Sequence, residues 1–268
     1  MKLAALLITS SLSIIISSCS SPEKEPKFHQ EMARIMDYNK AENYHLAIKL
    51  CDSLIEVDST FHYAYFEKGM THIRLNEDSL ALGDFEKLEA IDPNYPGLKT
   101  WHAITLHVTG RHLEAATLMH VALRANPNGF FGQGVSPGDW AECAGYFHDA
   151  GLSDSAIYVL DEYFNGYVQH VTEFKYLETT PLRTYATLLM EKKDFKKAFD
   201  KMKAAMESQN VDPSDYEPWI EVNILNGNYR EAQELLDNYV RDFHREGETE
   251  GVKRLRMMME AARGKRKS

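Results

Sequence analysis

One pentapeptide in this chain has the pattern of a hydrolase nucleophile. Gly134-Val135-Ser136-Pro137-Gly138 fits G-x-S-x-G, in which a serine at a sharp strand-to-helix turn attacks an acyl group. In such a site the residue after the serine donates its backbone N–H to the oxyanion, and Pro137 has no N–H. We therefore interpret 128–138 as a loop. We predict that the chain is not an enzyme and needs no cofactor.

Histidines are concentrated in one stretch, at positions 102, 107, 112 and 120. A zinc site on one helix favours histidines at i and i+4, because these share a face. A spacing of five rotates each successive residue by about 140°, so His102, His107 and His112 are expected to point apart. The chain also contains no His-Glu-x-x-His motif. We predict no metal site.

The N-terminus has the pattern of a secretory signal. Lys2 precedes an apolar run, and small residues follow it. The end of this run, Ile16-Ser17-Ser18-Cys19, resembles the bacterial lipobox, in which the cysteine becomes the lipidated N-terminus. We therefore expect a lipoprotein signal peptide at 1–18 and a lipid anchor on Cys19, with a polar tether to residue 27. The resemblance implies a bacterial cell envelope location, at the outer membrane and facing the periplasm.

Alanine recurs at a fixed interval over most of the chain. The interval is 34 residues within two runs, and one further alanine lies between them: Ala47, Ala81 and Ala115, then Ala156, then Ala198 and Ala232. Such a period is typical of stacked helix–turn–helix units. Around two of these alanines, Gly69 aligns with Ala103 and Phe85 with Met119. We expect the small residues to let two helices approach, and the larger side chain to fill the remaining space.

These residues resemble the tetratricopeptide repeat (TPR) pattern, in which A-x3-F and a closing Pro form the second half of each repeat. The segment 79–95, with Ala81, Phe85 and Pro93, is the best match. The resemblance implies an all-α, right-handed superhelical solenoid of about six units. We place the units at 28–61, 62–95, 96–129, 137–170, 179–212 and 213–246. Insertions at 128–138 and 171–178 are expected to divide the array into 28–129 and 130–246.

In this family the first helices of the repeats line a concave groove that holds a protein or peptide. By the motif positions, the residues of this chain expected in the groove are Tyr63, Phe66, Met70, Arg74, Trp101, Ile104, His107 and His148. Aromatic and methionine side chains on such a surface suit an apolar peptide or helix. The alternative is that several of these side chains face the neighbouring helix and belong to the core.

Charge and cysteine content restrict the function further. The net charge is −10, but 252–268 carries +6 and the rest −16, which argues against nucleic acid as a partner. We interpret 247–268 as a capping helix and basic tail, with Val252, Leu255 and Met259 on one face.

Cys51 and Cys143 lie three units apart, so we predict two buried free thiols.

The sequence thus predicts a non-catalytic envelope lipoprotein that acts as a scaffold, with a protein or peptide partner in the groove and a membrane contact through Cys19. Two alternatives stay open. One is a glycan-binding lipoprotein, and the other is a periplasmic immunity protein whose acidic body neutralises a basic toxin. The exposed end of a repeat stack also leaves homo-oligomerisation open.

Overall fold

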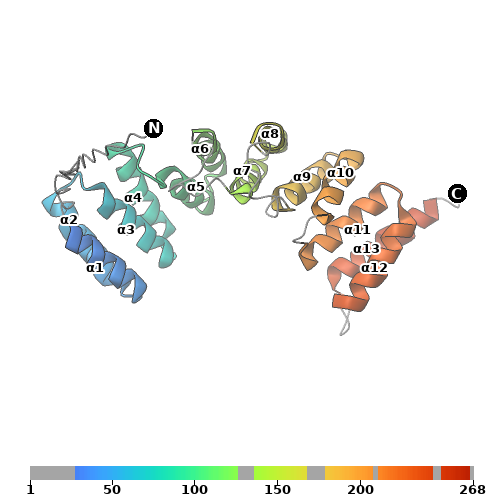
Figure 1. The fold of residues 1–268 in the computed structure, drawn as a ribbon, viewed down its shortest axis with the longest axis horizontal. Coiled ribbons are helices and arrows are strands. Elements are labelled where there is room, and N and C mark those ends of the chain that lie inside the picture. The colour runs from blue at the N-terminus through green and yellow to red at the C-terminus, as the bar shows by residue number, and fades with distance from the viewer. Residues whose placement is uncertain (1–27, 126–135, 168–178, 208–210, 244–248, 266–268) are drawn as a thin grey trace, which may run out of the picture.

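The computed structural model describes residues 28–125, 136–167, 179–207, 211–243 and 249–265. Within these ranges the chain forms thirteen α-helices and no strand, arranged as successive antiparallel pairs. The pairs stack side by side into an arch (Figure 1), with α5 and α7 on its concave side and α6 and α8 on its convex side. The predicted all-α solenoid is confirmed.

The helices are α1 (His29–Lys40), α2 (Tyr44–Val57), α3 (His62–Arg74), α4 (Asp78–Ile91), α5 (Leu98–Val108), α6 (His112–Ala125), α7 (Pro137–Asp149), α8 (Ser153–Glu162), α9 (Thr179–Glu191), α10 (Phe195–Met206), α11 (Tyr216–Leu225), α12 (Tyr229–Phe243) and α13 (Glu250–Lys265). A π-helical turn, η2 (Tyr163–Tyr167), extends α8, and a 3-10 turn, η5 (Pro213–Asp215), precedes α11. We name α1, α3, α5, α7, α9 and α11 the first helices of their pairs, and the following even-numbered helices the second.

Each pair is joined by the same tight turn. One residue per turn has a left-handed φ, and these residues are Glu42, Asn76, Gly110, Gly151, Lys193 and Gly227. The next N–H bonds back to the first helix, as in Arg111 N to Leu106 O at 2.8 Å, which closes a Schellman motif. Every left-handed residue comes five positions before one of the recurrent alanines. The 34-residue period is therefore a repeat of backbone conformation as well as of side-chain size.

The recurrent alanines are the points of closest helix contact. All six are fully buried, because a larger side chain would hold the two helices of a pair apart. The expected pairing of small and large residues is also present. A Cβ atom added to Gly69 would lie 2.7 Å from Phe85 Cε1, so the Phe85 ring occupies the space that the glycine leaves.

The largest hydrophobic cluster runs without a break from α5 to α11, from Ala103 to Val222. It crosses the position of the first insertion, since α6 packs on α7. The core of the described residues is therefore continuous from the third unit to the fourth. Cys143 lies in this cluster, and Cys51 lies in a separate cluster with Ile35 and Ala47. Both cysteines are buried and free, as predicted.

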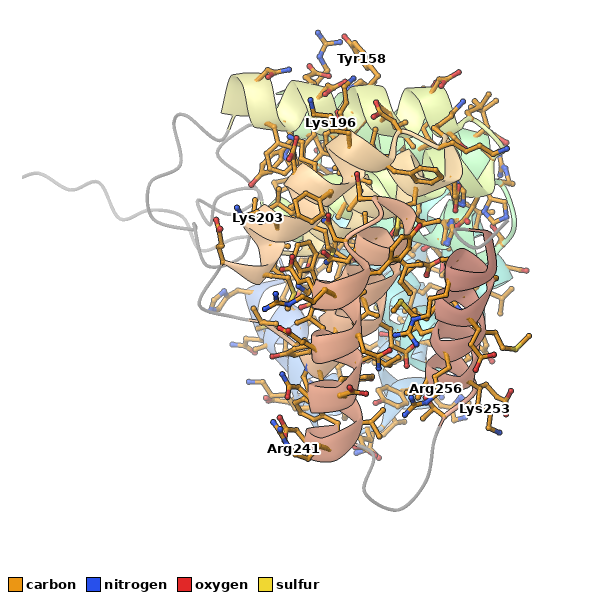
Figure 2. The ribbon with its side chains drawn as sticks, turned by 90° about the vertical axis from the view of Figure 1, so that its right-hand side faces the viewer. Tyr158, Lys196, Lys203, Arg241, Lys253 and Arg256 are labelled. Atoms are coloured by element: carbon orange, nitrogen blue, oxygen red, sulfur yellow. The ribbon has the colours of Figure 1, made fainter. Side chains whose placement is uncertain are left out.

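The C-terminal helix α13 caps the stack. Val252, Leu255 and Met259 are buried against α11 and α12, which confirms the predicted cap. Its basic side chains lie outside this contact, and Arg254 forms an ion pair with Glu221 of α11 at 2.8 Å. Figure 2 looks onto this end of the molecule and shows Lys253 and Arg256 on α13.

Several predicted features lie outside the described residues. They are the signal peptide 1–18, Cys19 with its tether, most of both insertions and the last three residues of the basic tail. In the described part of the chain, none of the helices has both the length and the apolar character needed to cross a membrane.

Candidate functional site

Four of the apolar side chains expected in the groove are half-buried. Tyr63 and Met70 come from α3, and Trp101 and Ile104 from α5. Each packs on a core cluster with one side and remains partly exposed on the other. Side chains held in this way are preorganised, so a partner that covers them loses little additional conformational entropy. We call these four residues the apolar strip.

Phe66 was expected beside this strip, and that expectation is wrong. Its side chain is only 9% exposed and packs between the rings of Phe85 and Tyr95, with centroid separations of 6.1 and 5.1 Å. The motif position is correct for α3, but Tyr95 follows α4 and covers the ring from the next turn. Phe66 therefore stabilises the second unit and is not available to a partner.

Polar groups border the strip at the contact of α1 with α3. Asn39 Nδ2 donates to Glu67 Oε2 at 3.3 Å, and Thr71 Oγ1 lies 3.0 Å from Asn39 Oδ1. Burial raises the pKa of Glu67, although Arg74 and the Asn39 hydrogen bond act in the opposite direction. Arg74 itself is exposed at the end of α3. A cationic group on a partner would find this carboxylate beside the apolar strip.

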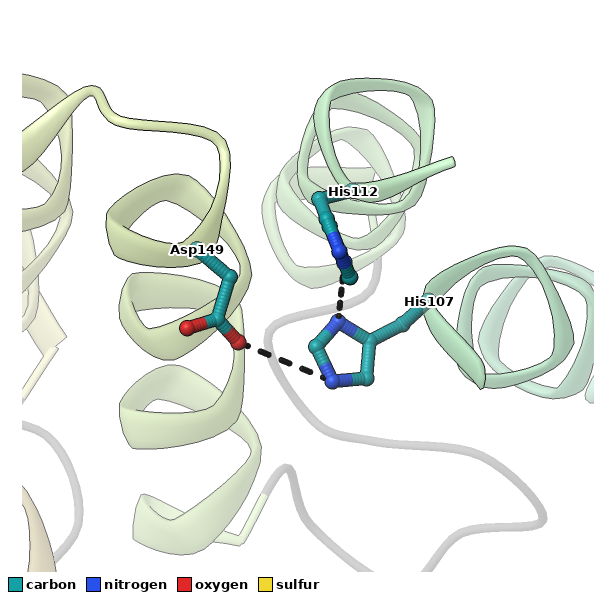
Figure 3. A group of neighbouring side chains, drawn as sticks. All are labelled: His107, His112 and Asp149. Carbon is teal, nitrogen blue, oxygen red and sulfur yellow. Dashed lines mark hydrogen bonds and ion pairs between the residues drawn. The ribbon is translucent and has the colours of Figure 1, made fainter. Parts of the chain in front are cut away.

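His107 and His112 were expected to point apart, and they do not. His107 lies in the last turn of α5 and His112 begins α6. The turn between the helices brings their Nδ1 atoms to 3.1 Å (Figure 3). Asp149, the last residue of α7, places Oδ2 3.7 Å from His107 Nε2. A rotation of about 140° for five residues holds only within one continuous helix, whereas a helix end and a turn lie between these two rings.

His148 belongs to a separate cluster one unit further on. Its Nδ1 lies 3.3 Å from Ser153 Oγ and 3.6 Å from Glu191 Oε2, the carboxylate of the next first helix. The eight predicted positions therefore do not form one site. Four of them make the apolar strip, Phe66 is core, Arg74 is exposed at the strip's border, and the two histidines each join a polar cluster at a helix end.

A cavity among the second and third units was not predicted. It has a volume of about 450 Å³ and lies between α4, α5 and α6, with Leu113 and Val121 among its apolar lining residues. The ring of His102 is buried at this cavity and makes no hydrogen bond in the described part of the chain, although Glu89 Oε2 lies 3.2 Å from its Nδ1. Burial lowers the pKa of His102. The signal in the sequence was the pair of apolar residues Leu113 and Val121 on α6, which are exposed. The repeat motif assigns groove positions only to first helices and therefore does not consider them.

Ser136 has a structural role. Its Oγ accepts the N–H of Gly138 at 3.1 Å, and Asp139 accepts the N–H of Ser136 at 3.0 Å. This capping box starts α7, with Pro137 at the first helical position where a missing N–H costs nothing. The G-x-S-x-G match is thus a helix cap, which explains why Pro follows the serine.

Sequence comparison detects only a short likeness. No family model matches the chain. Over 78 residues the chain is 31% identical to the peptidyl-prolyl cis-trans isomerase FKBP4 of Mus musculus, and equally to that of Rattus norvegicus. The match covers 29% of this chain and 17% of each relative. The chain thus spans less than a fifth of the length of these curated relatives.

Solved structures match over most of the chain. PilW, described as a widely conserved type IV pilus biogenesis factor, has a TM-score of 0.61 at 14% identity, covering 84% of this chain and 96% of that one. YrrB, a TPR protein with an unusual peptide-binding site, has 0.55 at 14% identity, covering 80% and 97%. A tetratricopeptide repeat protein from Parabacteroides merdae has 0.61 at 11% identity, covering 88% and 87%. The chain therefore has the TPR fold.

Proposed function

We propose that this chain is a non-catalytic adaptor that binds an apolar segment of a protein partner on the inner face of its arch. The observation that carries the proposal is the apolar strip of Tyr63, Met70, Trp101 and Ile104, which two consecutive first helices hold half-exposed. Aromatic side chains with one packed and one exposed side are common anchors of protein interfaces. The likeness to a TPR protein with a peptide-binding site supports this mode of binding.

The partner segment we propose is apolar with a cationic residue at one end. The strip would take two or three apolar side chains, spaced as on one face of a helix. Glu67 would face the cation, and the partner's charge would favour the ionised form of this carboxylate, whose pKa burial raises. A basic partner also suits the net charge of the chain outside its C-terminal segment, which is −16.

The location we propose is the bacterial envelope, with the chain anchored by lipid on Cys19 and facing the periplasm at the outer membrane. The signal-like segment ending in Ile16-Ser17-Ser18-Cys19 supports it. Two or more acyl chains on one cysteine suffice for stable anchoring. The adaptor would then hold its partner close to the membrane, as part of an envelope complex.

The proposal is tested by affinity purification of the full chain from gently solubilised bacterial membranes. Two variants, Met70→Ala and Trp101→Ala, shorten side chains of the strip, and Tyr158→Ala is the control. Tyr158 is 57% exposed on α8, on the convex side of the arch (Figure 2). We expect one envelope protein to be recovered with the wild type and the control, and at least tenfold less of it with either strip variant. Equal recovery from all four would refute binding on the inner face.

The anchor is tested separately with Cys19→Ala. We expect this variant to leave the membrane fraction while it retains partner binding in solution, since the strip lies far along the chain from residue 19. A variant that stays at the membrane would disprove the lipid anchor without affecting the binding proposal. Circular dichroism of each variant confirms that the helices are retained.

A further inference from the structure

Three side chains from three helix ends form a cluster at the contact between the third and fourth units. His107 lies in the last turn of α5, His112 begins α6 and Asp149 ends α7. One nitrogen of each ring and one carboxylate oxygen all lie within 4.8 Å of one another. Figure 3 shows the His112 and Asp149 side chains approaching the His107 ring from different sides. We propose that His107, His112 and Asp149 bind a divalent transition-metal cation, with Zn²⁺ as its simplest occupant.

The spacing of the ring nitrogens suits two ligands of one ion. Nitrogens bound to a tetrahedral zinc at about 2.0–2.1 Å lie about 3.3 Å apart. The Nδ1 atoms of His107 and His112 are 3.1 Å apart. The third ligand is less closely placed, because Asp149 Oδ2 lies 3.7 Å from His107 Nε2 and not beside the Nδ1 that faces His112. With one ligand atom taken from each residue, the three atoms lie within 4.8 Å of one another. Asp149 is 47% exposed, so its carboxylate can rotate toward the rings without disturbing the core.

The surroundings hold His107 in place. Its ring stacks on the buried Tyr146 of α7, with centroids 4.2 Å apart and planes 19° from parallel. The Schellman bond from Arg111 N to Leu106 O fixes the turn that sets His112 opposite His107. A metal site gains affinity when its ligands are positioned before the ion arrives. Two of the three ligands here are positioned by the fold itself.

The ligand types determine the class of cation. Imidazole nitrogens suit zinc, copper, iron and nickel, whereas calcium and magnesium prefer oxygen ligands throughout. Three protein ligands leave a fourth zinc position for water or for a side chain of a partner. The ion would join α5 and α6 of the third unit to α7 of the fourth. Its binding would therefore fix the angle between two units that the sequence separates by an insertion.

The test is calorimetric titration of ZnCl₂ into the purified full-length chain after treatment with a chelator. We expect one saturable site per chain. His112→Ala and Asp149→Asn should each weaken it by at least tenfold, since each removes a ligand. His45→Ala is the matched control because His45 is exposed on α2, and its affinity should equal that of the wild type. Helix content by circular dichroism is compared among all variants.

Thermal unfolding gives a second readout. At a Zn²⁺ concentration of about one hundred times the Kd, the midpoint of the wild type and of the control should rise by roughly 5 °C or more. The two ligand variants should show no such rise at that concentration. Zinc binding that His112→Ala and Asp149→Asn leave unchanged would place the ion elsewhere and overturn the proposal, as would a wild-type chain that binds none.

Discussion

Gly69→Ala is the sharpest test of how the repeat packs. Alanine normally stabilises a helix interior relative to glycine, by about 1 kcal/mol. In α3 the added Cβ would lie 2.7 Å from Phe85 Cε1 and 2.9 Å from Cζ, distances that real Cβ atoms essentially never show. Phe85 is fully buried and packs beside Phe66, so its ring has no free space to move into. The Phe85 ring or one of the two helices must therefore shift.

The magnitude follows from two opposing effects. Overpacking a well-packed core costs about 1–3 kcal/mol, and the rigid ring puts this site at the upper end. Subtracting the gain in helix propensity leaves a net loss of about 1–2 kcal/mol. Gly83→Ala in the neighbouring α4 is the matched control, because a Cβ there meets nothing within 4 Å. That variant should gain up to about 1 kcal/mol, so the two should differ by roughly 2–3 kcal/mol.

The assay is unfolding in urea, monitored by circular dichroism. The urea midpoint reports the change in stability if the dependence of the unfolding free energy on urea concentration is the same in all variants. A double variant, Gly69→Ala with Phe85→Met, copies the pair Ala103 and Met119 of the next unit, where both residues are buried. We expect the double variant to be more stable than the sum of its single changes, because the flexible methionine gives way to the new methyl group. If Gly69→Ala were as stable as Gly83→Ala, the reasoning from this close contact would be refuted.

Three further predictions test individual residues. Burial raises the pKa of Cys51 and Cys143 to about 12, so neither should be alkylated in the native chain at pH 8, and both should react in urea; mass spectrometry showing native labelling would contradict this. Ser136→Ala should lower the free energy of unfolding by about 1 kcal/mol through loss of the α7 cap, and an unchanged urea midpoint would argue against that cap. Because burial lowers the pKa of His102 below 6.5, its contribution to stability is present above pH 6.5 and is lost as the pH falls through the folded-state value. His102→Leu should make the unfolding midpoint less dependent on pH between 7 and 5, and an unchanged dependence would rule out His102 as its source.

The fold could be read from the sequence because its determinants are local and periodic. A buried alanine five residues after each left-handed turn recurs in every unit, and only small residues fit there. Three of the six turns have glycine and one has asparagine, the residues that accept this conformation most readily. Glu42 and Lys193 occupy the other two, so composition alone would have missed those turns. The recurrent alanines mark them nonetheless, since Ala47 and Ala198 each come five residues after one of these turns.

The inner face was only partly predictable, since exposure depends on residues from other helices. Motif positions place a side chain on the correct side of its own helix. They do not say whether a large residue elsewhere covers it, as Tyr95 covers Phe66. For the same reason the cavity beside His102 was missed, because its lining comes from three helices. Predicting which side chains are covered requires the packed structure, whereas the helices can be predicted from the sequence alone.

The histidine cluster could have been predicted from the same period that gave the fold. A turn at Gly110 places His107 and His112 opposite each other. Asp149 of the fourth unit aligns with Val108 of the third, because the two units are offset by 41 residues. The fourth unit repeats this arrangement with His148, Ser153 and Glu191. His148 Nδ1 lies 3.3 Å from Ser153 Oγ and 3.6 Å from Glu191 Oε2. It differs in two respects. A serine takes the place of the second imidazole, and the carboxylate of Glu191 faces Nδ1 of His148, whereas Asp149 faces Nε2 of His107.

The first difference yields a prediction of gained function. Ser153→His would give the fourth unit two imidazoles and a carboxylate, the same ligand types as His107, His112 and Asp149. We expect the variant to bind two equivalents of Zn²⁺ in the calorimetric titration, where the wild type binds one. Ser153→Ala is the control and should still bind one, because it adds no ligand. A second equivalent that also appears with Ser153→Ala would show that this position does not hold the ion, and the link between repeat geometry and metal binding would fail.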